Sequence, residues 1–564
     1  MLDDFDPSTI PDPALRQMVL TLMNQLEQLH AKVQAQAEEI QRLRDENNRL
    51  KGEQGKPNIK PNKPPRQLSS EAERAVPKPR QKRAKRAKLR IDRELVVPLD
   101  RSTLPADAQF KGYQSVVVQD VVLTTDTVRL LKAKYYSPSE HRTYLAAPPP
   151  GYEGQFGPGL KALVLTLYFD SGMSEPIIRA LLTQAGVQIS TGQISNLLIA
   201  DQERFHQERA DILAAGLHSS PWQHIDTTST RVDGANQQCH VLCNPLYTVY
   251  TTLPQRDRLH VLDVLRGGQP RSFRLDASAE RLMRLMDVSA RDQRKLAQIP
   301  RDQDLSEALL DEYLASHGKG ISEQRRKWIK DSLAIAAYHA QRAPPFPIVH
   351  TLLCDDAPQW TMLTEAVALC WVHDRRHYKK LEPRLAYHRQ LVDDFLKQYW
   401  DYYHELLRYR EQPSMAEAER LRKEFDRLFA TKTGYEALDE RIRITRDKKR
   451  GLLMVLAHPE LPLHNNPAEL GARRRVRKRD VSFGPQSERG AAAWDTFQTL
   501  AATAQKLGVR FYDYVRDRIC QGTRLPHLAD LIAERAKDLH LGASWQAASP
   551  RPAWKPVQVQ CWHA

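Results

Sequence analysis

The sequence is poor in cysteine: all six cysteines lie at or after Cys239, scattered through a chain of 564 residues. This usage is typical of reduced intracellular thiols and argues against a secreted, disulfide-stabilised protein. The chain also lacks an apolar run of the roughly 20 residues that span a membrane, and its N-terminus is acidic where a signal peptide is basic. It has no phosphate-binding loop of the form G-x-x-x-x-G-K-S/T, which argues against an NTP-driven translocase. We therefore expect a cytoplasmic protein with no membrane partner.

Positive charge dominates what is present. Lysine and arginine number 84 against 69 aspartates and glutamates, which gives a formal net charge of +15 and a pI of about 9.4. This excess predicts a polyanionic partner such as double-stranded DNA, and with it association with the nucleoid, although a membrane surface or a ribosome would also fit the charge alone. The length predicts several domains joined by linkers.

Residues 1–50 carry a heptad repeat. From Leu15 to Leu50 the apolar positions are spaced alternately four and three apart, which is the seam of a coiled coil. The a positions are Val19, Leu26, Val33, Ile40 and Asn47, and the d positions are mostly leucine. This choice favours a parallel two-stranded pairing, so we expect a dimerisation helix and a homodimer. The alternative, a helix that folds back on its own chain, is disfavoured by its polar outer positions.

Residues 51–90 are expected to be a Pro-rich and basic linker. Repeated Pro, Gly and Lys in KGEQGKPNIKPNKPPRQLSS prevent a packed core. The run KPRQKRAKRAKLR at 78–90 then has no acidic residue and can contact several DNA phosphates, although a solubilising tail is the simpler interpretation. The DNA contacts expected here are Lys82, Arg83, Lys85 and Arg86.

Two small units are predicted next. Residues 91–148 contain the β-branched segments SVVVQDVVL and TVRLLKAKYY, which indicate a small antiparallel β module. Residues 150–205 contain an apolar helical stripe, a break at Gly186 and a second helix that opens at Ser190 or Thr191. This order is typical of a helix-turn-helix-like DNA-binding region, although two packed helices with a glycine turn are more often plain scaffold.

Several acidic residues lie where secondary structure would present them. Asp226 lies on a predicted strand, WQHIDTTSTRV, where a buried carboxylate is costly unless cations hold it. The apolar run in PIVHTLLCDDAPQW ends at Asp355 and Asp356, as in a buried parallel strand that delivers a carboxylate at its C-terminal end. In LPLHNNPAELGARRRVRKRD, Asn466 can cap a helix whose first turn carries Glu469. The alternative is that these are unrelated surface acids.

The helix that begins near Asn466 is also strongly basic. Side chains within two turns of Glu469 are expected to contact DNA phosphates. They are Arg473, Arg474, Arg475, Arg477 and Lys478.

The successive motifs IDTTSTRVDG, CDDAPQW, CWVHDRRHYKKL, NNPAEL and SFGPQSERGAAAWDTFQTLAATAQKLG resemble those of the insertion sequence 66 family of DDE transposases. The resemblance covers roughly residues 150–520. It implies a mixed α/β fold with a ribonuclease-H-like catalytic core at 215–520, interrupted by helical insertions, and leaves 521–564 as a C-terminal tail. Family members usually carry a cysteine-ligated zinc module before the helix-turn-helix, and this chain has no cysteines there.

The same resemblance implies that Asp226, Asp355 and Glu469 are the catalytic and metal-binding triad, with Asp356 an alternative to Asp355. Carboxylate oxygens select Mg²⁺ or Mn²⁺, and two such ions would support cleavage at the transposon ends and attack of the freed 3′-hydroxyls on target DNA. Helper proteins of the same element are possible further partners.

Other residues and other functions stay open on the sequence alone. Residues that could support the site are His373, Arg376 and Asn466, each of which could equally be an ordinary strand-end or surface residue. The alternatives to a transposase are a ribonuclease-H-like nuclease without strand transfer and a non-catalytic DNA-binding regulator derived from a transposase.

Overall fold

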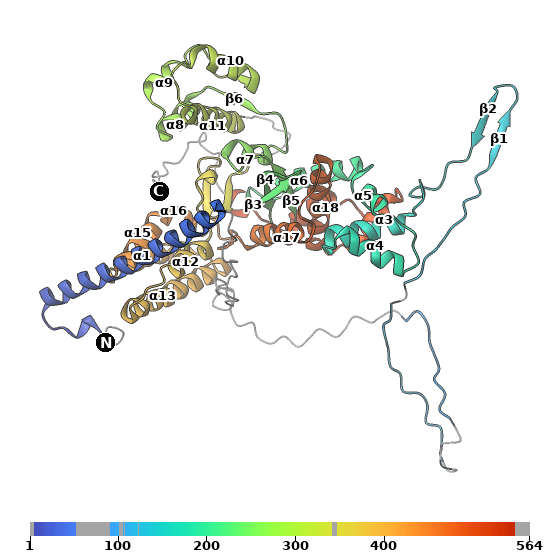
Figure 1. Ribbon diagram of the computed structural model, residues 1–564, viewed down its shortest axis with the longest axis horizontal. Helices are drawn as coiled ribbons and strands as arrows, with labels where there is room; N and C mark the ends of the chain where they lie inside the picture. The colour runs from blue at the N-terminus through green and yellow to red at the C-terminus, as the bar shows by residue number, and fades with distance from the viewer. Residues whose placement is uncertain are drawn as a thin grey trace.

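A five-stranded mixed sheet forms the centre of the protein (Figure 1). The computed structural model describes residues 5–51, 91–100, 105, 108–121, 123–340 and 347–546. The strands are β3 (Trp222–Val232), β4 (Ala235–Cys243), β5 (Thr248–Leu253), β8 (Thr351–Cys354) and β9 (Ala366–Leu369). Their order is β5-β4-β3-β8-β9; β4 is antiparallel to both of its neighbours, β3 and β5, and β8 and β9 run parallel to β3. The expected mixed α/β class is confirmed.

One face of this sheet carries both an apolar cluster and an acidic side chain. Val241 on β4 pairs with Asp226 on β3 and with Tyr250 on β5, so the three side chains share a face. Helix α17 (Asn466–Ser482) packs against β3 and β4 on that face. The approach is close at Gly471, where a Cβ atom would lie 2.7 Å from Val241 Cγ1. The pleat of the sheet thus directs Asp226 toward α17.

Helix α18 (Glu488–Lys506) covers the outer edge of β5. Backbone N–H groups of alternate β5 residues donate to α18 side chains: Thr248 to Thr503 at 3.2 Å, Tyr250 to Thr499 at 3.0 Å, and Thr252 to Asp495 at 2.6 Å. The spacing of the donors on β5 matches the spacing of the acceptors on α18, because four helical residues and two strand residues both advance the chain by roughly 6 Å. These backbone N–H groups at the edge of β5 therefore have hydrogen-bond partners, and α18 occupies the place where another strand would pair.

Helical segments interrupt the sheet twice (Figure 1). Between β5 and β8 lie α7 (Arg258–Leu265), β6 (Ser272–Arg274), α8 (Ala277–Leu285), α9 (Ala290–Arg294), β7 (Asp304–Ser306), α10 (Glu307–His317) and α11 (Glu323–Ala340). Between β9 and α17 lie α12 (Trp371–Lys379), α13 (Ala386–Glu411), α14 (Met415–Leu428), α15 (Glu436–Asp447) and α16 (Lys449–Leu452). The second insertion has a core of its own, built around Trp371, Tyr399 and Phe425. Within the described residues, no helix is both long and apolar enough to cross a membrane.

Helix α1 (Pro13–Leu50) spans the predicted coiled coil and packs on the second insertion by its N-terminal half. The Glu27 carboxylate accepts the N–H groups of Arg384 and Leu385 at the start of α13, at 2.9 and 2.8 Å. Asn24 is buried and bonds to the backbone of Gly434 and Glu436. Part of α1 therefore folds back on its own chain, which was the disfavoured alternative.

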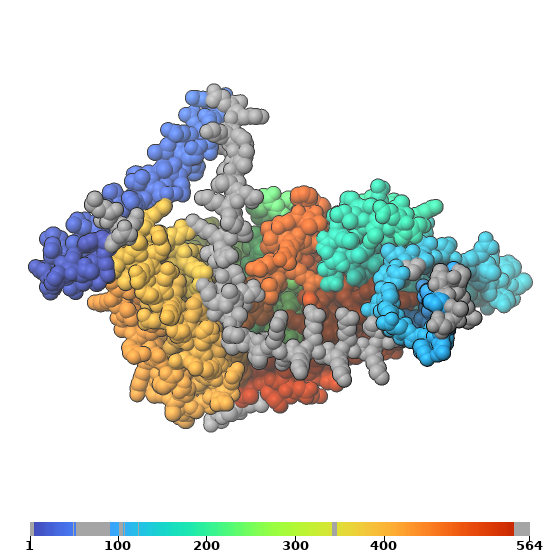
Figure 2. Space-filling model, turned by 90° about the horizontal axis from the view of Figure 1, so that it is seen from below, coloured from blue at the N-terminus to red at the C-terminus, as the bar shows by residue number. Residues whose placement is uncertain are grey.

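The heptad seam of α1 stays largely free of that contact. Seven seam side chains are at least half exposed: Leu15, Leu22, Leu29, Val33, Ile40, Leu43 and Leu50. In the space-filling view the blue helix extends beyond the yellow and orange insertion (Figure 2). The docked face and the seam are thus two different faces of one helix, and the seam remains available to a partner.

The region of the expected β module contains one short hairpin. Strands β1 (Lys134–Ser137) and β2 (Arg142–Leu145) are antiparallel, as expected. The described residues at 91–121 and 123–133 form neither helix nor strand, so the strand expected at 115–123 is not found there. Its apolar side chains, Val116, Val117 and Val118 among them, are exposed. A two-stranded hairpin offers too little surface to bury these apolar side chains, so the sheet does not extend to this segment.

The segment before β3 is helical, as expected. It comprises α3 (Pro158–Leu165), a π-helical turn (Thr166–Asp170), α4 (Glu175–Gln184), α5 (Thr191–Ile199) and α6 (Glu203–His218). Ser190 caps α5 through a reciprocal pair of hydrogen bonds with Gln193, which places the second helix where the sequence predicted it.

The chain after α18 belongs to the same body. Helix α19 (Phe511–Ile519) packs on α3, and α20 (Leu528–Leu539) packs on α6. Before the last short helix, α21 (Ala543–Gln546), the carbonyl of Leu541 accepts the indole N–H of Trp222 at 2.6 Å. The described part of the segment predicted as a C-terminal tail, residues 521–546, therefore packs on the core.

Candidate active site

Two adjacent parallel strands bring the first two predicted carboxylates level with each other. Strands β3 and β8 pair from Trp222 opposite Thr351 to His224 opposite Leu353. Two residues further along both strands, the same register sets Asp226 beside Asp355. Asp355 follows the last residue of β8, as the sequence pattern predicted.

Helix α17 brings the third carboxylate, Glu469, in its first turn. The residue that anchors this helix is Asn465, whose Nδ2 donates to the carbonyl of Ile225 at 2.8 Å and whose Oδ1 lies 2.9 Å from Nδ1 of His224. Burial lowers the pKa of His224 to about 3, so its imidazole is neutral and can donate to this oxygen. Asn465 ties the helix to the residues immediately before Asp226. Sequence reasoning chose Asn466, the first helical residue, and missed Asn465.

Asp226, Asp355 and Glu469, hereafter the carboxylate cluster, influence one another electrostatically. The pKa of the Asp226 carboxyl is raised to about 7, first by burial and then by the negative charges of Asp355 and Glu469. The N–H of Thr227, which donates to Asp226 at 2.8 Å, and the charge of Arg376 act in the opposite direction. Three acidic groups with too little positive charge among them form a site that favours a cation.

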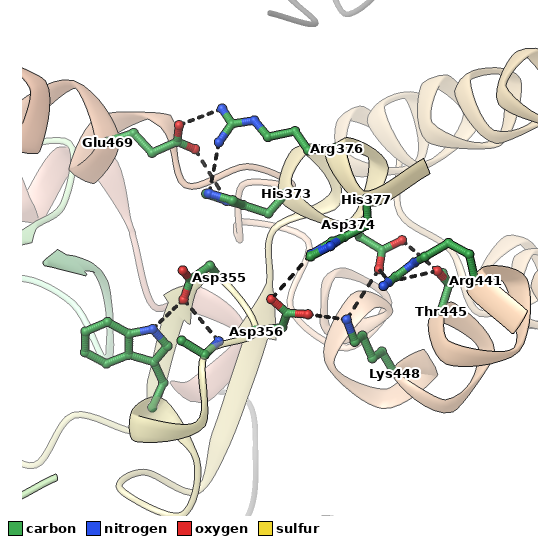
Figure 3. A network of polar contacts seen from close by, with 12 residues as sticks. Asp355, Asp356, His373, Asp374, Arg376, His377, Arg441, Thr445, Lys448 and Glu469 are labelled. Atoms are coloured by element: carbon green, nitrogen blue, oxygen red, sulfur yellow. Dashed lines mark hydrogen bonds and ion pairs between the residues drawn. The ribbon is translucent and has the colours of Figure 1, made fainter. Parts of the chain in front are cut away.

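Glu469 contacts two of the three residues that the sequence offered as possible support for the site (Figure 3). Arg376 Nη2 donates to Glu469 Oε2 at 2.7 Å, and Arg376 Nη1 lies 3.0 Å from His373 Nε2. His373 Nδ1 lies 3.5 Å from Glu469 Oε1. Both residues come from α12, at the junction of the sheet and the second insertion.

The donor atoms of this cluster are of the kind that hard divalent cations bind. Glu469 Oε1 is buried and accepts no hydrogen bond from the residues that the structure describes. Such an orphaned carboxylate oxygen is costly unless an ion engages it. Carboxylate oxygens are the ligands that Mg²⁺ and Mn²⁺ prefer.

Asp355 is oriented by its own loop. Its Oδ1 accepts the indole N–H of Trp360 at 2.5 Å and the N–H of Ala357 at 3.2 Å. Arg258 on α7 holds the same loop by donating to the carbonyls of Pro358 and Thr361, each at 3.1 Å. Sequence analysis missed both Trp360 and Arg258. The tryptophan five residues after the aspartate was the available signal.

Asp356 belongs to a separate set of contacts (Figure 3). Its carboxylate pairs with Lys448 and faces His377, whose Nε2 lies 3.8 Å away. The imidazole of His377 first, and then the ammonium of Lys448, hold the pKa of the Asp356 carboxyl far below its usual range. The neighbouring Asp374 pairs with Arg441, lies 3.7 Å from Lys448 and accepts the Thr445 hydroxyl at 2.8 Å. Together Asp356, Asp374, Arg441 and Lys448 form what we call the balanced network.

Among the described residues, the three potential ligands that lie close enough to share one ion form a different group, which has Glu469 in common with the carboxylate cluster. Cys370, His373 and Glu469 each offer an atom within 4.8 Å of the others. Burial raises the pKa of the Cys370 thiol to about 12, and its sulfur already accepts the N–H of Asn465 at 3.2 Å. A neutral thiol is a weak metal ligand, so we assign no separate metal centre to this group.

The basic residues of α17 lie on two faces of the helix, one exposed and one buried. Arg473 and Arg477 are exposed, and Arg474 is half-buried and pairs with Asp170. Arg475 is buried and pairs with Asp495, and Lys478 is buried, with its ammonium 3.3 Å from the centre of the Tyr168 ring. Arg475 and Lys478, which the sequence offered for DNA contact, are therefore engaged inside the protein.

The repeated small residues of α17 could have revealed that buried face. Ala468, Gly471 and Ala472 precede Arg475 and Lys478 at helical spacing and lie on the same side of the helix. The other predicted DNA contacts, Lys82, Arg83, Lys85 and Arg86, lie outside the described residues.

Comparison with known proteins identifies the family of this chain. The family model described as the Transposase IS66 family matches residues 153–275 and 335–493, and the gap between the two segments falls on α8–α11. An uncharacterized protein of Sinorhizobium fredii, y4jO, is 31% identical over 329 residues, which is 58% of this chain and the full length of that protein. No solved structure matches. The chain belongs to the IS66 family of transposases.

Proposed function

We propose that this protein is a DNA transposase that binds the ends of an insertion sequence, cleaves phosphodiester bonds there and transfers the 3′-hydroxyl ends to target DNA. The observation that carries the proposal is the carboxylate cluster: Asp226 and Asp355 level on parallel strands, with Glu469 delivered by a helix. The strand order, with three antiparallel strands followed by two parallel ones, supports a ribonuclease-H-like core.

Asp226, Asp355 and Glu469 would hold two Mg²⁺ or Mn²⁺ ions. Bound there, the ions would activate the attacking water or 3′-hydroxyl and stabilise charge on the leaving oxygen. The chain's own residues supply the rest. Trp360 orients Asp355, Asn465 fixes the start of α17 against β3, and Arg376 holds the Glu469 carboxylate until a cation competes for it.

The same geometry favours Asp355 over Asp356 as the second catalytic carboxylate. Asp356 is committed to Lys448 and His377, both from the second insertion. Asp355 instead acts electrostatically on Asp226 and has no basic partner of that kind among the described residues. A carboxylate already neutralised by lysine has little to offer a metal ion.

DNA would approach along the exposed side of α17, where Arg473 and Arg477 can pair with phosphates. The helices at 150–205 would contribute to recognition of the transposon ends, and the basic linker would add sequence-independent affinity. The exposed seam of α1 would pair two copies in a homodimer, which suits an element with two ends. Helper proteins of the same element could join this assembly.

The decisive experiment is Mg²⁺- or Mn²⁺-dependent cleavage and joining of a labelled duplex that carries the element's own ends. We expect joined products from the wild-type protein and none from Asp355→Ala, which should still bind the duplex. The matched control is Asp356→Ala, which should retain cleavage in proportion to its folded fraction.

The other outcomes would point elsewhere. Hydrolysis without joining would favour a nuclease that lacks strand transfer. Binding with neither reaction, even with helper proteins supplied, would favour a non-catalytic DNA-binding regulator. Full activity of Asp355→Ala would overturn the site assignment.

A further inference from the structure

Phe483 is an exposed aromatic residue in an unusual backbone conformation. Its side chain is 82% exposed, and it ends α17 with φ of 58°, in the left-handed region that residues other than glycine rarely adopt. An aromatic side chain gains nothing from such exposure, and the backbone conformation has an energetic cost. The surrounding fold must therefore impose this placement.

The turn that carries Phe483 is rigidly held. The Phe483 N–H donates to the carbonyl of Arg479 at 2.7 Å, and the carbonyl of Pro485 accepts the N–H of Asp233 at 3.0 Å. Gly484 is buried against the β3–β4 hairpin so closely that a Cβ atom would lie 2.7 Å from the carbonyl oxygen of Arg231. The ring is thus presented to solvent from a fixed support.

Phe483 also lies at the far end of the exposed, basic side of α17. Arg473 and Arg477 follow Glu469 by four and eight residues, so at about 100° per residue they are turned by roughly 40° and 80° from that carboxylate around the helix axis. Asp480 is the one exposed acidic residue on this side between Glu469 and Phe483. At 1.5 Å per residue, the fourteen residues from Glu469 to Phe483 span roughly 21 Å, or about six nucleotides of a DNA strand.

We propose that Phe483 is a stacking platform for an unpaired base in the DNA strand that runs along α17 from the carboxylate cluster. Arg473 and Arg477 would hold the phosphates of the intervening nucleotides. Every base offers a flat face to an aromatic ring, so the contact would not depend on sequence. The base must leave the duplex to reach the ring, and stacking on Phe483 would offset part of the cost of unpairing. This inference rests on the proposed function, because it requires DNA at the carboxylate cluster.

The occupant is inferred to be DNA because of the charge around the ring. Leu470 and Val481 on α17 are also partly exposed, and a second copy of the chain could in principle cover them together with Phe483. The arginines between them favour a polyanion, since burying Arg473 and Arg477 in an apolar interface would leave their charges unpaired.

The test uses the full-length protein without divalent metal, so that binding is measured apart from cleavage. The probes are duplexes that carry the element's end, with 2-aminopurine at the fifth, sixth or seventh nucleotide from the scissile phosphate on either side. We expect the wild-type protein to change the fluorescence of one of these bases. Phe483→Ala should abolish that change, and Phe483→Tyr should keep it.

Affinity supplies the second readout. Phe483→Ala should bind the end duplex about tenfold more weakly than wild type. On a duplex in which the contacted base is replaced by an abasic site, Phe483→Ala and the wild-type protein should bind with equal affinity. Leu309→Ala, which removes an exposed apolar side chain on α10, is the matched control and should change neither signal.

The outcomes are distinct. Equal affinity and equal fluorescence for wild type and Phe483→Ala would overturn the stacking role and leave the proposed function standing. Dissociation of a dimer by Phe483→Ala, with the base signal intact, would instead assign the ring to a protein interface. Failure of the wild-type protein to bind any end duplex would overturn both proposals.

Discussion

Asp355 and Glu469 of the carboxylate cluster lie beside the balanced network (Figure 3), and the two sets of acidic residues differ in how their charge is compensated. In the balanced network, Asp356 and Asp374 are matched by Lys448 and Arg441. In the carboxylate cluster, three acidic groups share the nearby charge of Arg376, and the pKa of Asp226 is raised to about 7.

We take this difference to distinguish a structural network from the proposed cation site. A network whose charges cancel fixes the second insertion against the end of β8, and folding alone satisfies it. A cluster whose charges do not cancel stores unfavourable energy that a cation can release on binding. Asp355 and Asp356 are adjacent in sequence, yet they fall on opposite sides of this division.

The largest expected effect comes from removing one negative charge from the carboxylate cluster. Asp226→Asn should lower the cleavage rate by about a thousandfold or more, because a cation ligand is lost at a site where each 1.4 kcal/mol of barrier is a factor of ten. DNA affinity and folding should be unchanged or slightly improved, since like charges are removed. Cleavage of a labelled end duplex under single-turnover conditions measures the rate.

Asp356→Asn is the matched control for that comparison. It removes the same charge one residue away from Asp355, and its cleavage rate per folded molecule should stay within about tenfold of wild type. Its stability should fall, because Lys448 loses its carboxylate partner. A cleavage defect as deep as that of Asp226→Asn would remove the distinction between the two sites.

The next effect concerns stability. Arg441→Met leaves the buried Asp374 without its guanidinium partner, which should lower the free energy of unfolding by about 3 kcal/mol. Arg376→Met removes the same charge from the carboxylate cluster, where a divalent cation can replace it. Thermal unfolding with and without Mg²⁺ distinguishes the two: the ion should restore the stability of Arg376→Met and leave that of Arg441→Met low. Equal rescue of both variants would contradict the comparison.

Local sequence patterns predicted the parts of the site that depend on neighbours along the chain. The apolar run before Asp355 indicated a buried strand, and the stretch NNPAEL indicated a helix whose first turn carries Glu469. Both predictions depend on interactions within a few residues, so they could be made without knowing the fold. The strand predicted around Asp226 is β3, and it was predicted from local residues for the same reason.

The missed parts depend on residues distant in sequence. Asn465 acts through Ile225 and His224, about 240 positions earlier, and nothing in the doublet of asparagines says which one makes that contact. The commitment of Asp356 likewise depends on Lys448, 92 positions later. Only the packing of the second insertion on the sheet separates the two adjacent aspartates.

The smallest expected effect is a pH dependence of Mg²⁺ affinity. It should follow the carboxylate cluster and not the balanced network. A cation needs the ionised form of Asp226, whose pKa is about 7 in the metal-free protein. Apparent Mg²⁺ affinity should therefore rise about tenfold per pH unit up to pH 7 and level off above it.

The same pKa makes a prediction about stability without metal. A carboxyl with a raised pKa in the folded state keeps its proton there after the unfolded chain has lost it, so its contribution to stability is greatest below about pH 4 and is lost as the pH rises through 7. The melting temperature of the wild-type protein should accordingly fall between pH 5 and pH 8 relative to Asp226→Asn. Asp356→Asn should leave this difference in place, because the pKa of Asp356 is lowered and its carboxyl is already ionised throughout that range. A metal-free profile that changes in Asp356→Asn and not in Asp226→Asn would mean that Asp356, and not Asp226, carries the raised pKa.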